Sequence, residues 1–144
     1  MRARYRTRQL VNAANLSTLA GLAVAKSLGA RLERGPDGVV LARGAGGRFP
    51  RAEAFTIGNV VVLRVDPSPE LLRHESRHST QWAWCVLLFL PLYLGAVAWS
   101  WARTGDHWSR NVFEQRAGLA DGGYRVNPTR RERRRLQASE GQRG

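Results

Sequence analysis

The chain has 144 residues, a formal net charge of +12 and a single cysteine. This length fits one domain with a tail, and one cysteine excludes both an internal disulfide framework and a zinc site built on cysteines. Of the 23 lysine and arginine residues only Lys26 is a lysine, and the arginines gather at the two ends of the chain. So basic a chain favours anionic partners, either lipid head groups or nucleic acid. Cys85 lies in an apolar run, which indicates a buried, inert thiol.

The N-terminal third begins with a polar, basic stretch and continues as a helical pattern. We expect residues 1–9 to be disordered. From about residue 8 to residue 32 apolar side chains recur at spacings of three and four, which predicts a helix that restarts at Asn15 or Ser17. The Ala-Val-Ala sequence at 23–25 after a basic start has some features of a signal peptide. Polar residues interrupt the apolar run, so a packing helix is favoured.

Two strand signals follow. The Gly-Pro-Asp-Gly sequence at 35–38 predicts a turn, and residues 39–43 predict a short strand after it. The glycine-rich stretch 44–47 lacks the Gly-Lys-Ser/Thr ending and the following helix of a phosphate loop, so we interpret it as a flexible loop. Residues 55–65 are rich in β-branched side chains, with a bulge or tight turn expected at 58–59. A short antiparallel sheet is therefore expected.

A helix with a metal-binding pattern comes next. Ser68 is suited to the N-cap and Pro69 to the first helical position. Within this helix the sequence reads His74-Glu75-x-x-His78. Side chains four residues apart share one helix face, so both imidazoles can bind one zinc ion, and Glu75 can act as general base on a zinc-bound water.

Simpler roles exist for the same side chains. Two histidines and a glutamate on a helix also occur as a solvated polar face, with Glu75 paired to Arg73 or Arg77. Arg77 lies on a different face from the histidines and is expected to be solvated. Gln81 lies one turn beyond His78 and would either orient that ligand in the second shell or face solvent.

The stretch 82–102 is uncharged and apolar, with tryptophans near both ends. About 20 such residues can cross a bilayer, and tryptophans near both ends are typical of the aromatic belts of membrane helices. Pro91 could instead break the stretch into a helical hairpin that is buried or dips into one leaflet. In either case we expect an apolar surface that docks on a membrane lipid or on a membrane or protein partner.

The remainder of the chain holds one more helical pattern and a basic tail. Residues 111–117 look helical up to Gly118, and residues 1–124 are expected to form one domain. Residues 125–144 are expected to be a flexible basic tail, with some helix around 130–138.

Two motifs resemble the HExxH zincins, and the arrangement most resembles the gluzincin type, in which a glutamate on a later helix is the third zinc ligand. The first motif is His-Glu-x-x-His-x-x-Gln over 74–81, and the second is Asn-x-x-Glu-x-x-Ala over 111–117. The resemblance covers roughly residues 56 to 118. It implies an α+β zincin-like domain with His74, His78 and Glu114 as zinc ligands, Glu75 as general base, and a peptide as substrate.

Other candidates for the third ligand are His107 and, more weakly, Asp106 and Asp121. Glu114 is preferred because a helical carboxylate can be aimed rigidly at a metal. A single membrane crossing by 82–102 would separate His78 from Glu114 by about 30 Å of hydrocarbon, so one zinc ion could not reach both. We therefore favour the hairpin broken near Pro91.

Taken together, these patterns predict a small α+β, membrane-associated, zinc-dependent metallopeptidase-like hydrolase, with its basic termini on the cytoplasmic side. A soluble cytoplasmic location is the alternative. The rival function is a non-enzymatic protein without metal, either a single-span or a peripheral membrane protein with basic flanks. Nucleic acid is not expected as a partner, because the aromatic residues lie in the apolar run and the arginines in the ends, without interleaving.

Overall fold

The computed structural model describes residues 3–47 and 52–141, and it is an α+β structure. This agrees with the α+β part of the expected fold class. The chain forms two compact units, Met1–Leu90 and Pro91–Gly144. The boundary between them lies inside the range 1–124.

The first unit holds α1 (Ala3–Ala14), α2 (Ser17–Ser27), β1 (Arg31–Arg34), the 3-10 turn η1 (Pro36–Gly38), β2 (Val40–Arg43), β3 (Ala54–Ile57), β4 (Val60–Leu63), α3 (Pro69–Cys85) and the 3-10 turn η2 (Val86–Leu88). The second unit holds most of α4 (Phe89–Thr104), then α5 (Val112–Ala117) and α6 (Arg130–Gly141).

The sheet is mixed, with strand order β1-β2-β4-β3. The β3–β4 pair is antiparallel, as predicted, and so is the β1–β2 pair, although the sequence does not predict β1 as a strand. β2 and β4 pair in parallel, so the prediction of an antiparallel sheet is wrong for this pair. The reason is topological. The chain passes from β2 to the far edge to form β3, and a turn at Gly58-Asn59 then returns β4 to the middle of the sheet. The turn expected at 58–59 is confirmed.

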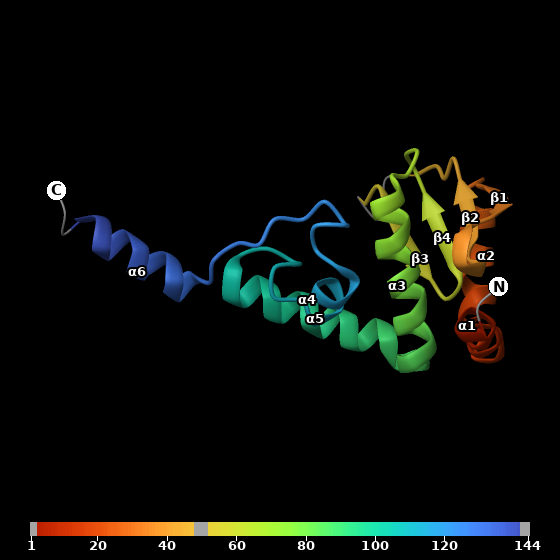
Figure 1. Cartoon of the computed structure of the whole chain (residues 1–144), viewed down its shortest axis with the longest axis horizontal. Coiled ribbons are helices and arrows are strands. Elements are labelled where there is room, and N and C mark those ends of the chain that lie inside the picture. Colours follow the sequence, from red (N-terminus) through yellow and green to blue (C-terminus); the bar gives the residue numbers. More distant parts are fainter. Residues whose placement is uncertain (1–2, 48–51, 142–144) are drawn as a thin grey trace. The chain divides into compact units, whose positions relative to one another are not determined.

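Helices cover both faces of this sheet, α3 on one face and α2 on the other (Figure 1). All four side chains of β4 are buried, because alternate residues of a strand point to opposite faces and both faces are covered. One core consists of Ala25, Ala42, Ala45, Val60 and Val62. The other consists of Val39, Leu41, Ala54, Val61 and Leu63, with Leu71 and Leu72 of α3 packed against it.

The N-terminal segment is helical from Ala3, so the expectation of disorder is wrong for residues 3–9; residues 1–2 lie outside the described part. Its polar side chains are used inside the fold. Arg8, 4% exposed, donates from Nη1 to the hydroxyl and the carbonyl of Ser76 at 2.9 and 3.1 Å. Asn12 is fully buried and donates to the carbonyl of Ser79 at 2.9 Å. These bonds join α1 to α3, and such pairings are not visible in a local pattern.

The region 8–32, which the sequence predicts to be helical, contains the end of α1, the whole of α2 and the start of β1. A fresh helix begins at Ser17, as predicted, after Leu16 adopts a positive φ of 64°. This helix ends at Ser27, and the chain enters strand β1 at Arg31, so the last residues of the predicted helix are extended instead.

The apolar stretch 82–102 is broken into separate helical segments, as expected, but the expected position of the break at Pro91 is wrong. The helix break lies earlier, at η2, where Val86 has φ 53°, a value uncommon for a β-branched residue. Pro91 is the third residue of α4, where a missing backbone N–H leaves no helical hydrogen bond unmade.

Among the described residues no single helix is long and apolar enough to cross a membrane. α3 and α4 meet that length and composition only as a pair, which is sharply bent at the break between them.

Replacing Gly58 tests how closely α2 approaches the β3–β4 turn. Its φ is +59°, and an added Cβ would lie 2.4 Å from the backbone carbon of Ser17 and 2.5 Å from the nitrogen of Thr18. Gly29 has φ +69° with nothing within 4 Å of such a Cβ, so it is a matched control for backbone strain alone. G58A should lower the free energy of unfolding by roughly 1–3 kcal/mol more than G29A, measured by urea denaturation. Equal losses would show that the turn tolerates the added methyl group.

Candidate metal centre

The helix that carries the His-Glu-x-x-His motif starts where the sequence predicts. Ser68 is its N-cap, and the Ser68 hydroxyl accepts a hydrogen bond from the Leu71 nitrogen at 3.1 Å. Pro69 is the first helical residue. This start fixes the rotation of α3, so that His74 and His78 lie one turn apart on the same face.

The two imidazoles converge. His74 and His78 are 2% and 7% exposed, and their Nε2 atoms lie 3.0 Å apart. The Gln81 Oε1 atom lies 2.8 Å from His78 Nδ1, where it can accept the ring proton of the tautomer that carries this proton on Nδ1. His78 then presents the lone pair of Nε2 toward His74. Two nitrogen lone pairs at this separation repel unless a proton or a cation lies between them.

Glu75 is buried rather than solvated, with an exposed fraction of 4%. The Thr56 hydroxyl donates to Glu75 Oε2 at 2.6 Å. Thr56 belongs to β3, an edge strand of the sheet, and its carbonyl accepts from the Trp82 indole nitrogen at 2.9 Å. Thr56 could not be predicted from the sequence, because its partner lies 19 residues away and only the packing of α3 beside β3 brings the two together.

Glu114 occupies the predicted helix of the second unit, α5. Asn111 caps this helix by accepting a hydrogen bond from the Phe113 nitrogen at 3.0 Å, so the Asn-x-x-Glu spacing places Glu114 in the first turn. Glu114 is 2% exposed, and its Oε1 accepts a short hydrogen bond from the Tyr93 hydroxyl of α4. No sequence signal links Tyr93 to Glu114.

His74, His78 and Glu114 are all buried, and one ligand atom of each lies within 4.8 Å of those of the other two. Two imidazole nitrogens and a carboxylate oxygen at this spacing are close enough to bind one metal ion.

The competing third ligands have other surroundings. His107 is exposed and makes an edge contact with the Trp108 ring. Asp106 accepts hydrogen bonds from the Trp108 nitrogen, the Ser109 nitrogen and hydroxyl, and the Asn127 amide, at 2.7 to 2.9 Å. Across residues 3–47 and 52–141, no metal-ligating group includes His107, Asp106 or Asp121.

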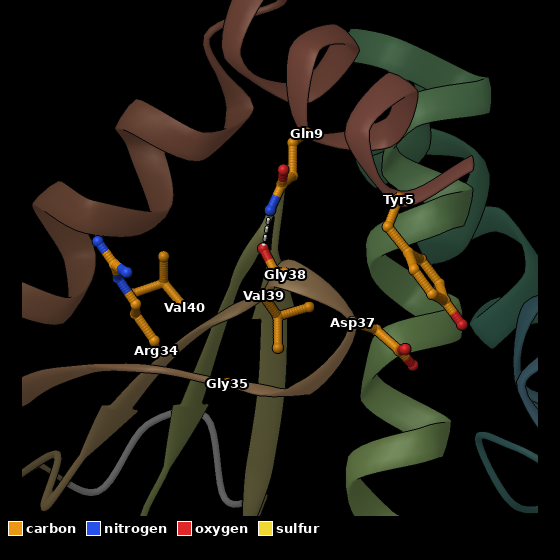
Figure 2. A pocket seen from close by; sticks show the side chains of 8 residues that line it. All are labelled: Tyr5, Gln9, Arg34, Gly35, Asp37, Gly38, Val39 and Val40. Carbon is orange, nitrogen blue, oxygen red and sulfur yellow. Dashed lines mark hydrogen bonds between the residues drawn. The ribbon is translucent and has the colours of Figure 1, made fainter. Parts of the chain in front are cut away.

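A separate pocket of about 760 Å³ lies in the first unit and contains none of the motif residues. Figure 2 shows the Gln9 side chain reaching the Gly38 carbonyl across it. Its lining residues are Tyr5, Gln9, Arg34, Gly35, Asp37, Gly38, Val39 and Val40. With neither histidine nor glutamate, this pocket is not a second metal centre.

No protein-family model, no curated protein and no solved structure matches the chain. The resemblance to zincins therefore stays a prediction from the two sequence motifs.

Asp106 provides a test of the loop that follows α4. Burial alone would raise the pKa of this carboxyl, but the hydrogen bonds from Ser109, Asn127 and Trp108 outweigh it and hold the pKa well below its usual range. A depressed folded-state pKa stabilises the fold above the unfolded value, and this stabilisation is lost as the pH falls through the folded value. D106N should therefore lower the urea midpoint more at pH 7 than near pH 2.5. A loss of equal size at both pH values would contradict this.

Proposed function

We propose that the chain is a zinc-dependent hydrolase of the peptidase type, with the metal held by His74, His78 and Glu114. The observation that carries the proposal is the convergence of the two buried Nε2 atoms, 3.0 Å apart, in a group that includes the buried Glu114 carboxylate. In a tetrahedral zinc site with bonds of 2.0–2.1 Å, two nitrogen ligands are separated by about 3.3 Å. The imidazoles need to move apart by only a few tenths of an ångström.

The donor set also fits zinc chemically. Two imidazoles and one carboxylate form a three-ligand set of the kind that leaves a fourth position open, as in catalytic rather than structural sites. Zinc bound there would supply Lewis acidity, polarising a substrate carbonyl and lowering the pKa of a water molecule.

Glu75 is the residue proposed to move the proton. Its carboxylate would accept a proton from the attacking water and later give it to the leaving amine, which requires it to be ionised and held in one orientation. The hydrogen bond from Thr56 supports both conditions, since a hydroxyl that donates to a carboxylate stabilises its charged form.

Gln81 is proposed as a positioning residue. Accepting the Nδ1 proton of His78 favours the tautomer in which Nε2 is free to bind a metal, and partners of this kind typically change metal affinity by about 10–100-fold. Tyr93 restrains the Glu114 carboxylate in the same manner.

Zinc affinity of matched variants tests the site. H78A and E114A should each weaken binding on the order of 100-fold or more, because each removes one of three protein ligands. H107A removes an exposed histidine outside the group and should leave the affinity unchanged. Competition titration against a chromophoric chelator measures these affinities. An unchanged affinity in E114A would exclude Glu114 as a ligand.

Glu75→Gln separates metal binding from chemistry. The variant should retain one zinc ion per chain and lose at least about 100-fold in hydrolysis of a quenched fluorescent peptide library, the lower end of what general-base catalysis contributes. E70Q changes an exposed glutamate on the same helix and should keep full activity. Full activity in E75Q, with zinc bound, would reject the proposed mechanism.

A further inference from the structure

The exposed surface of helix α4 is apolar over an unusually wide arc. At 100° per residue, the exposed residues from Leu90 to Arg103 cover an arc of roughly 220°, and only Arg103 at its edge is charged. The large side chains of this arc are 50 to 58% exposed: Leu90, Leu92, Leu94, Trp99 and Trp101. A helix facing water normally carries polar residues over such an arc.

The opposite side of α4 is fixed by the second unit. The Ser100 hydroxyl, fully buried, accepts a hydrogen bond from the Arg110 nitrogen at 2.9 Å. Arg133 Nη2 of α6 donates to the Thr104 carbonyl at 2.9 Å. Together with the bond from Tyr93 to Glu114, these contacts hold the helix along its length. α4 therefore cannot rotate to hide its apolar arc without breaking buried hydrogen bonds.

Arginines surround the tryptophan end of the arc. The Arg103 guanidinium lies over the Trp99 ring at 5.1 Å, and the Arg130 guanidinium lies over the Trp101 ring at 5.8 Å. Arg130 begins α6, whose exposed residues include five arginines within six positions. Tryptophan capped by arginine is the pairing that suits the boundary between hydrocarbon and anionic head groups.

We propose that α4 docks in the interfacial layer of an anionic lipid membrane, with Leu92, Leu94, Trp99 and Trp101 inserted and the arginines of α6 among the head groups. Charge selects this occupant. A second copy of a chain with net charge +12 would be repelled, whereas anionic lipid complements it. The 16 residues of α4 span about 24 Å, less than the hydrocarbon thickness of about 30 Å, which suits a helix lying in the interface. This inference does not depend on zinc or on hydrolysis.

Vesicle co-sedimentation of the full chain tests it. The protein should bind vesicles containing phosphatidylglycerol at least about tenfold more tightly than vesicles of phosphatidylcholine alone, and added salt should weaken binding. The double variant L92S/L94S should lower this affinity on the order of tenfold or more, because two inserted leucines are lost. The control L10S/L19S replaces two leucines of the first unit that are 71% and 61% exposed. Its vesicle affinity should stay within about twofold of that of the unchanged chain.

Several results would overturn the proposal. One is no binding to anionic vesicles by a protein whose circular dichroism shows it to be folded. Another is that R134Q/R135Q loses vesicle binding while L92S/L94S keeps it, which would assign the contact to α6 alone. Binding to a DNA duplex but not to vesicles would assign the charge to nucleic acid. A dimer that L92S/L94S dissociates, seen by analytical ultracentrifugation, would assign the apolar arc to a second copy.

Discussion

Two buried imidazole nitrogens, 3.0 Å apart on consecutive turns of α3, set the main constraint in this protein. One proton can join them in an N–H···N hydrogen bond, and the direction of that bond depends on the tautomers of the two rings. A divalent metal held by both nitrogens would take the place of that proton. It would also balance the charge of the Glu114 carboxylate, whose ligand atom lies within 4.8 Å of theirs.

Contacts within the first unit fix the orientation of α3, and with it the face that carries His74 and His78. Leu71 and Leu72 pack on the sheet, and the Ser76 and Ser79 backbones accept hydrogen bonds from Arg8 and Asn12 of α1. Some of the arginines of this basic chain are buried and stabilise the fold, and Arg8 is an example. Burial lowers the pKa of its guanidinium, but Arg8 keeps three hydrogen-bond acceptors on α3 and at the Asp37 carbonyl, so it serves the fold and not an external anion. The arginines of α6 are exposed, and one of them, Arg133, also donates to the Thr104 carbonyl.

Local rules account for what the sequence predicts correctly. The Ser68 and Asn111 caps, the turn at Gly58-Asn59 and the four-residue histidine spacing each depend on a few neighbouring residues. Most of the failures involve distant partners. The parallel β2–β4 pair requires β3 to form at the far edge, the helicity of residues 3–9 depends on α3, and the contacts of Thr56 and Tyr93 with the two glutamates depend on tertiary packing. The break at Val86 instead of Pro91 shows that proline is tolerated in a first helical turn.

The proposed hydrolase depends first on zinc held by His74, His78 and Glu114. X-ray absorption at the zinc edge, on the full chain loaded with one equivalent of zinc, tests this ligand set most directly. We expect nitrogen and oxygen ligands at about 2.0–2.1 Å with the multiple-scattering signature of two imidazoles, reduced to one in H78A and unchanged in H107A. A spectrum with one imidazole or none, or with a sulfur ligand from Cys85, would contradict this ligand set.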